Sequence, residues 1–194
     1  MKSKIILFMP CIDSGGVEKN FFLISNFLAK NIKNVTVITI SKNIRNQLNE
    51  KINFVSLNYD FCNKLSRRVK FVLGLFLLIK EIFKNKDTLV LSFQANIYCA
   101  FLSKLFSFNL IMRSNSSPEG WSKNFIKKFL YKFGLNAADQ VIVNSQDFKK
   151  IIKKKFNVNS VKIYNPLNSQ EILNLSRKKI KFNFFEKDYL NLIN

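Results

Sequence analysis

The feature that most constrains the fold is an alternation of short β-type runs and helical segments along almost the whole chain. Residues 5–8 form a continuous apolar run, and residues 35–40 are rich in β-branched side chains. Both patterns are typical of buried strands. Between them, Val17, Phe21, Ile24 and Leu28 recur at the spacing of one helix face. The first part of the chain therefore predicts a βαβ unit.

The same alternation continues to residue 164. We expect further strands at residues 53–57, 89–93, 110–113, 140–144 and 161–164, and helices at residues 67–83, 97–106, 121–133 and 146–156. Strands that alternate with helices predict a mostly parallel sheet with helices on both faces and right-handed crossovers. The expected fold class is α/β, a three-layer αβα domain with a sheet of about seven strands.

The pattern weakens after Pro166. Residues 169–181 suit a helix, and residues 189–193 form another strand-like run at the end of the chain. We therefore predict one domain over residues 1–167, and a linker with the start of a second, missing domain over residues 168–194.

Composition excludes several classes of site. The sequence has no histidine, which removes His-based triads, His-bound metals and histidine general bases. Cys11, Cys62 and Cys99 lack the spacing of metal ligands, so neither a zinc site nor a disulfide framework is indicated. No metal and no bound cofactor are expected.

The net charge of +20 attracts nucleic acid, anionic lipid and phosphorylated substrates alike. The same excess of lysine also arises from A+T-rich coding without selection for binding, so the net charge does not indicate which of these partners binds. No secretory signal is visible, and the apolar run at residues 69–79 is too short to span a membrane.

Candidate ligand-binding residues follow the ends of the predicted strands, where ligands bind in open parallel sheets. Gly15 and Gly16 connect the first strand to the first helix, so bare backbone N–H groups and the helix dipole there suit a phosphate. The alternative is a simple tight turn. The fingerprints of dinucleotide-binding loops and P-loops are both absent.

Polar residues follow the later strands. Gln94, Asn96 and Asn115 suit sugar hydroxyls, and Arg113 suits a phosphate. Ser145 follows the sixth strand and looks first of all like a helix N-cap, although it would also lie near the same edge.

Three motifs, in the right order, resemble the family 4 type glycosyltransferases of GT-B fold. The first motif, ILFMPCIDSGGVEK (residues 6–19), resembles their first strand, Gly-Gly loop and glutamate-bearing helix. The second, ADQVIVNS (residues 138–145), resembles their late strand, and the third, YNPL (residues 164–167), resembles their inter-domain boundary. SF at residues 92–93 and RSN at residues 113–115 fit strand ends of bacterial surface-polysaccharide and lipopolysaccharide members.

The resemblance implies the Rossmann-like N-terminal, acceptor-side half of a GT-B enzyme. Such an enzyme moves a sugar from a nucleotide-sugar donor to a glycan or lipid-linked acceptor, usually without a metal. Its Gly-Gly loop approaches the donor diphosphate, and the C-terminal half carries an E-x7-E pair. This chain has no such pair and no cleft histidine, so we expect the isolated chain to be inactive.

Two further interpretations concern partners and location. The segment from Trp121 mixes Phe125 and Phe129 with lysines, which suits either an anionic membrane surface or an ordinary helix with packed aromatics. We favour the ordinary helix for this segment, and membrane-surface contact for the protein as a whole. We therefore expect a cytoplasmic protein at the inner face of the cytoplasmic membrane.

The alternatives to a transferase are a basic nucleic-acid-binding module and a non-catalytic scaffold. Lysine runs such as residues 153–155 suit phosphate contacts. No nucleic-acid reader motif is present, so nucleic acid is not expected as a partner.

Overall fold

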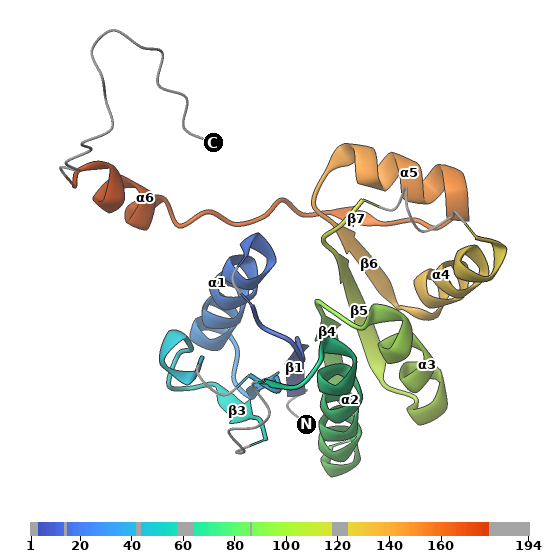
Figure 1. The fold of residues 1–194 in the computed structure, drawn as a ribbon, viewed down its shortest axis with the longest axis horizontal. Coiled ribbons are helices and arrows are strands. Elements are labelled where there is room, and N and C mark those ends of the chain that lie inside the picture. Colours follow the sequence, from blue (N-terminus) through green and yellow to red (C-terminus); the bar gives the residue numbers. More distant parts are fainter. Residues whose placement is uncertain are drawn as a thin grey trace, which may run out of the picture.

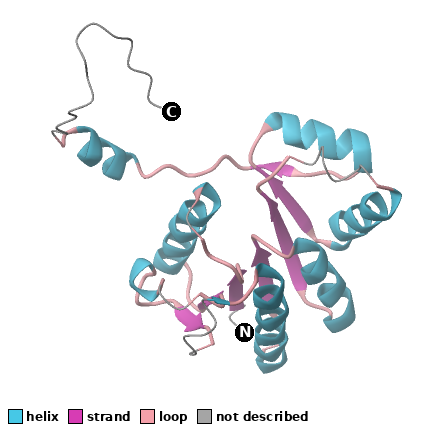
Figure 2. Cartoon of the chain, in the orientation of Figure 1, coloured by secondary structure: helices cyan, strands magenta, loops and turns pink. Residues whose placement is uncertain are grey.

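The computed structural model describes residues 4–13, 15–41, 44–57, 64–85, 87–117 and 124–178. They form a seven-stranded parallel sheet in the order β3-β2-β1-β4-β5-β6-β7, flanked by helices (Figures 1 and 2). The strands are β1 (Lys4–Phe8), β2 (Val35–Ile38), β3 (Asn53–Val55), β4 (Thr88–Ser92), β5 (Asn109–Ser114), β6 (Gln140–Val143) and β7 (Val161–Lys162). The α/β, Rossmann-like fold class is confirmed.

The helices are α1 (Gly16–Asn31), α2 (Arg67–Lys84), α3 (Asn96–Phe106), α4 (Phe125–Ala137), α5 (Gln146–Phe156) and α6 (Ser169–Ser176), with a short 3₁₀ turn, η1 (Arg45–Gln47). Alternate residues of β1 point to opposite faces of the sheet and enter two separate cores. Ile6 and Phe8 pack in the core beneath α2 to α5. Leu7 packs with Phe21 of α1 in the core on the other face.

Helices α1, α2, α3, α4 and α5 each run back antiparallel to the strands, so their N-termini gather at the carboxyl edge of the sheet (Figure 1). The strand order steps from β1 to β2 in one direction and from β1 to β4 in the other. That reversal opens space between the loops that follow β1 and β4, and it is where ligands bind in open α/β sheets.

Two boundaries differ from the expected ones for clear reasons. Helix α4 was expected over residues 121–133, but it begins after Asn124, whose side chain accepts a hydrogen bond from the Ile126 N–H. It continues past Gly134 to Ala137, and this last turn buries Leu135 and Ala137 in the core. Trp121 lies outside the described residues.

At the C-terminal end, the expected strand at 161–164 is shorter, and the expected helix at 169–181 ends at Ser176. The strand expected at 189–193 and Cys62 lie outside the described residues. Helix α6 stands apart from the sheet at the end of an extended connection (Figure 1). Among the residues described, no helix is long and apolar enough to cross a membrane.

Candidate functional site

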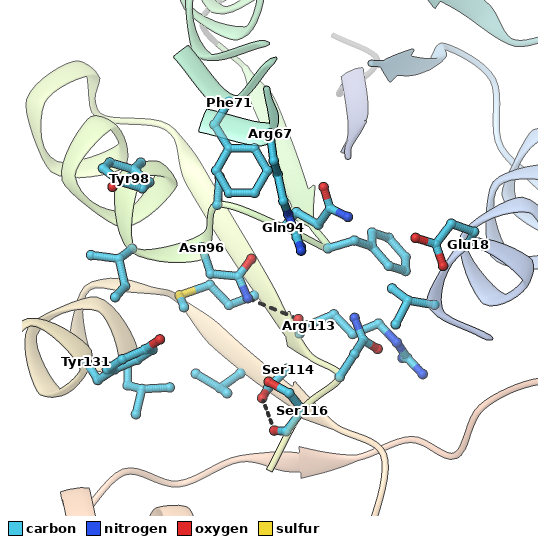
Figure 3. A pocket seen from close by; sticks show the side chains of 18 residues that line it. Glu18, Arg67, Phe71, Gln94, Asn96, Tyr98, Arg113, Ser114, Ser116 and Tyr131 are labelled. Carbon is cyan, nitrogen blue, oxygen red and sulfur yellow. Dashed lines mark hydrogen bonds between the residues drawn. The ribbon is translucent and has the colours of Figure 1, made fainter. Parts of the chain in front are cut away.

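A cavity of about 510 Å³ opens at the carboxyl edge of the sheet, among the loops that follow β4 and β5 and the first turns of three helices. Figure 3 shows Glu18 of α1 on one side and Tyr98 and Tyr131 on the opposite side. The lining residues are Val17, Glu18, Arg67, Phe71, Phe93, Gln94, Ala95, Asn96, Ile97, Tyr98, Met112, Arg113, Ser114, Asn115, Ser116, Tyr131, Leu135 and Val141. A space of this size suits a small-molecule ligand.

The Gly-Gly turn lies beside this cavity. Gly15 is the N-cap of α1 with extended backbone, and no side chain caps the helix. A Cβ at Gly15 would lie 2.7 Å from Glu18 Oε2, whereas a Cβ at Gly16 would meet no atom within 4 Å. The glutamate therefore lies against the start of its own helix, where a carboxylate is favoured by the helix dipole.

Gln94 and Asn96 join the loops of neighbouring strands. Gln94 Oε1 accepts a hydrogen bond of 3.1 Å from the Cys11 N–H, which ties the loop after β4 to the loop after β1. Asn96 Nδ2 donates to the Arg113 carbonyl at 3.0 Å (Figure 3). The Oδ1 atom of Asn96 is buried and has no hydrogen-bond partner.

Arg113 is the most unusual residue of the cavity wall, because it is only 2% exposed. Its Nη2 donates to Asn165 Oδ1 at 2.9 Å and to the Ile163 carbonyl at 3.5 Å, while its Nε is buried without a partner. Burial lowers the pKa of its guanidinium from the ordinary value. Arginine nevertheless stays protonated in proteins, so a charge is buried here without a carboxylate among the described residues.

Other unsatisfied polar atoms accompany Arg113 at the same edge. Both side-chain polar atoms of Asn115 are buried and bond to no described residue, and the same holds for Ser92 Oγ at the end of β4 and Asn144 Oδ1 just after β6. Each such group costs about 1–3 kcal/mol when no partner satisfies it. A polar ligand in the cavity would recover part of that energy for the atoms that line it.

The expected site residues are therefore only partly brought together. Gln94, Asn96, Arg113 and Asn115 line one cavity. Gly16 borders a second space of about 570 Å³, between α1 and the connection to α6. Ser145 lines neither space, and its Oγ accepts a hydrogen bond of 3.1 Å from the Phe148 N–H, which confirms its expected role as a helix N-cap.

Sequence reasoning missed the contribution of α2. Arg67 lies in the first turn of this helix and stacks over the Phe71 ring with 5.5 Å from Cζ to the ring centroid. Tyr98 and Tyr131 were also missed, and burial raises the pKa of the Tyr131 hydroxyl. One signal was available for Arg67: it is followed by Arg68, and cations in a first turn oppose the helix dipole.

The chemistry that this lining offers is binding and orientation. Its polar groups are amides, hydroxyls, two guanidinium groups and one carboxylate. Among the described residues, no three His, Cys, Asp or Glu side chains cluster in a way that could hold a metal ion.

No family model matches the sequence, and no curated protein is significantly similar to it. Solved structures with similar folds include Anabaena Alr3699/HepE in complex with UDP and glucose, at a TM-score of 0.55 and 16% identity over 90% of this chain and 50% of that one. UGT2 of Phytolacca americana, complexed with UDP-2fluoro-glucose and pterostilbene, has a TM-score of 0.53 and 10% identity over 82% and 52%.

The N-terminal domain of Candida albicans trehalose-6-phosphate phosphatase is also similar, with a TM-score of 0.53 and 13% identity over 80% of this chain and 43% of that one. At these identities the likeness shows the fold alone. The chain spans about half the length of the structures it matches, and its architecture is that of one half of a GT-B fold.

Proposed function

We propose that this chain is the acceptor-side half of a GT-B glycosyltransferase of the family 4 type, which transfers a sugar from a nucleotide-sugar donor to a glycan or lipid-linked acceptor in surface-polysaccharide synthesis. The observation that carries the proposal is the cavity at the carboxyl edge of the sheet, next to the point where the strand order reverses, with its unsatisfied amide atoms and buried arginine. Sugars present hydroxyl groups that both donate and accept, which suits Asn96 and Asn115.

The similar structures support this assignment because two of them were solved with UDP or a UDP-sugar analogue. In the proposed enzyme a second α/β domain supplies most of the nucleotide site and the E-x7-E pair. The 194-residue chain then has one wall of the active site and no sugar-transfer activity by itself.

The test is sugar transfer from radiolabelled UDP-sugars to a lipid extract of the source cells. The purified 194-residue chain is compared with the same chain joined to any second α/β domain that its reading frame encodes. We expect transfer only with both halves. Transfer by the chain alone would overturn the inactive half-enzyme, and no transfer by the joined form would favour a non-catalytic scaffold.

The face formed by α2, α3 and α4 supports an anionic membrane surface as a second partner. The aromatics of α4 are divided: Tyr131 and Phe133 pack against the core as expected for an ordinary helix, whereas Phe125 and Phe129 are exposed, as is Ile126. The outer surfaces of α2 and α3 also expose large apolar side chains, including Phe76 and Leu105. The only acidic side chain in these three helices is the buried Glu81.

Exposed apolar side chains among lysines and without acids match an anionic bilayer, where apolar groups enter the headgroup region. Sedimentation with phosphatidylglycerol vesicles and with phosphatidylcholine vesicles tests this partner. We expect binding to the anionic vesicles, weakened by Phe129→Ser. Phe27→Ser is the matched control, because Phe27 is 65% exposed against 63% for Phe129 but lies on α1 at the other face.

Equal vesicle binding by the wild type and Phe129→Ser would contradict this docking face. Binding of short RNA or DNA without any vesicle binding would instead favour a nucleic-acid-binding module, which also explains the exposed lysines of α5.

A further inference from the structure

Two arginines of the cavity have no counter-charge among the residues that the structure describes. Arg67 and Arg113 both line it, and no carboxylate of the described residues lies within salt-bridge distance of either guanidinium group. Arg113 is buried, and its Nε has no hydrogen-bond partner. Buried charges in proteins are normally paired, so an anion is the missing component of this wall.

The Gly-Gly turn, unlike the two arginines, already has a negative charge beside it. The carboxylate of Glu18 already lies against Gly15 at the start of α1, at 2.7 Å from where a Cβ would be. The positive end of that helix thus has an anion from the chain itself. An incoming phosphate is therefore attracted to the two arginines, while Glu18 repels it from the turn.

The rest of the cavity indicates what is attached to the anion. Tyr98 and Tyr131 form the wall opposite Glu18 (Figure 3), and aromatic rings of this kind can pack against the apolar face of a sugar. Asn96 Oδ1 and both side-chain polar atoms of Asn115 are unsatisfied and can bond hydroxyl groups. A single phosphate ion would leave most of this 510 Å³ space unfilled.

We infer that the cavity binds a phosphorylated sugar, with the phosphoryl group held by Arg67 and Arg113 and the sugar ring between the tyrosines and the asparagines. This inference rests on the proposed function and adds to it that the acceptor carries a phosphorylated sugar, while the donor diphosphate binds elsewhere. Arg113 also donates to Asn165 in the connection after β7, so its position is set before the ligand arrives.

The test is calorimetric titration of the 194-residue chain with glucose 6-phosphate, inorganic phosphate, glucose and UDP at low salt. We expect glucose 6-phosphate to bind more tightly than inorganic phosphate, and glucose to bind weakly or not at all. Added NaCl should weaken the binding of both phosphorylated ligands, because the contact is an ion pair.

Single substitutions locate the phosphoryl group. Arg67→Gln and Arg113→Gln should each weaken glucose 6-phosphate binding by roughly 10- to 100-fold, as expected for one charge-assisted contact. Arg68→Gln is the matched control, because it removes the same charge from the same helix turn but from a side chain that does not line the cavity. Arg67 is exposed, so Arg67→Gln remains informative even if Arg113→Gln fails to fold.

Three results would overturn the inference. They are no binding of glucose 6-phosphate at 10 mM, equal losses of glucose 6-phosphate affinity in Arg67→Gln and Arg68→Gln, or tighter binding of glucose than of inorganic phosphate. UDP binding that survives both cavity substitutions would be consistent with a separate donor site. If UDP alone binds and depends on both arginines, the cavity holds the donor, so the acceptor assignment is wrong while the transferase proposal stands. If the chain binds sugar phosphate but the two-domain form transfers no sugar, the binding inference stands and the transferase proposal is wrong.

Discussion

Helix α2 crosses strand β1 so closely at Gly74 that a methyl group there has no space. A Cβ built on Gly74 lies 2.6 Å from Pro10 Cβ and 3.4 Å from two ring carbons of Phe8. Carbon atoms in contact prefer about 3.5–4.0 Å, so Gly74→Ala requires the helix to move outward by about 1 Å. Pro10 cannot rotate away, because its Cβ belongs to a rigid ring.

The expected cost follows from two opposing effects. Alanine gains about 1 kcal/mol over glycine in a helix interior, whereas overpacking a close-packed core costs about 1–3 kcal/mol and occasionally more. An outward shift also loosens the packing of Leu78, which is fully buried on the same helix. We expect Gly74→Ala to destabilise the protein by about 1–2 kcal/mol, which lowers the Tm by about 2–8 °C for a chain of this size.

Gly134→Ala is the matched control. A Cβ at Gly134 in α4 meets Ile97 Cγ1 at 3.5 Å and Ala100 Cβ at 3.8 Å, which are ordinary contacts. This variant should gain about 0.5–1 kcal/mol from helix propensity. Thermal unfolding followed by circular dichroism should thus give Tm changes of opposite sign. An unchanged or higher Tm for Gly74→Ala would refute the reasoning, and so would a lower Tm for Gly134→Ala.

Three further predictions concern charge and the Gly-Gly turn. Arg113→Gln should leave the Tm of the ligand-free protein unchanged or higher, because it removes a buried charge that has no carboxylate partner within the described ranges; a fall of more than about 3 °C, or about 1 kcal/mol, would contradict this. Glu81→Gln should cost about 1–3 kcal/mol at pH 7 in urea unfolding. Burial alone would raise the pKa of Glu81, but hydrogen bonds from Lys4 and Lys84 outweigh it and the net pKa is lowered. The contribution is therefore present above the ordinary carboxyl pKa and is lost as pH falls through the lowered value, so the wild type and Glu81→Gln should converge in acid. Gly16→Leu should keep the wild-type Tm, since no atom lies within 4 Å of the new Cβ, and should reduce transfer by the two-domain form; full activity would remove the turn from the site.

Most of the fold could be predicted from the sequence because local signals and tertiary packing agree. Helix α5 has the bounds that its pattern predicts, since Ser145 caps its start and Asn157 ends it in a left-handed conformation. Helix α4 differs because Gly134 locally favours a helix end, yet the helix continues so that Leu135 and Ala137 are buried in the core beside α3. Such a contact depends on a helix that lies elsewhere in the sequence, so no local pattern reveals it.

The sequence predicted at which edge of the sheet the candidate site lies, but not how its side chains are arranged there. Strand ends and loop composition predicted that Gln94, Asn96, Arg113 and Asn115 would lie near one another, and they do. The pattern did not reveal that the Gln94 amide is used to hold the backbone of the loop after β1. Nor could it place the side chain of Arg67, because that depends on how α2 crosses the sheet.

One backbone departure lies in the cavity wall itself. Ala95 has φ of 55° at the N-cap of α3, in the left-handed region that alanine rarely adopts. It lines the cavity between Gln94 and Asn96. Strain of this kind costs about 1 kcal/mol or more and persists where the surrounding structure needs it, which here means where two polar side chains must be held at the cavity wall.

The opposite edge of the sheet shows that this chain can satisfy buried charges when no ligand is involved. There Glu81 is buried, yet both of its oxygens are bonded, to Lys4 and to Lys84 at 2.5 Å each. Arg113 at the carboxyl edge is equally buried, but its partners in the described part of the chain are neutral oxygens, and the Asn115 side chain has no partner there. Folding requirements alone would act on both edges in the same way. The difference supports the inference that the cavity binds a ligand, and that the ligand brings the negative charge.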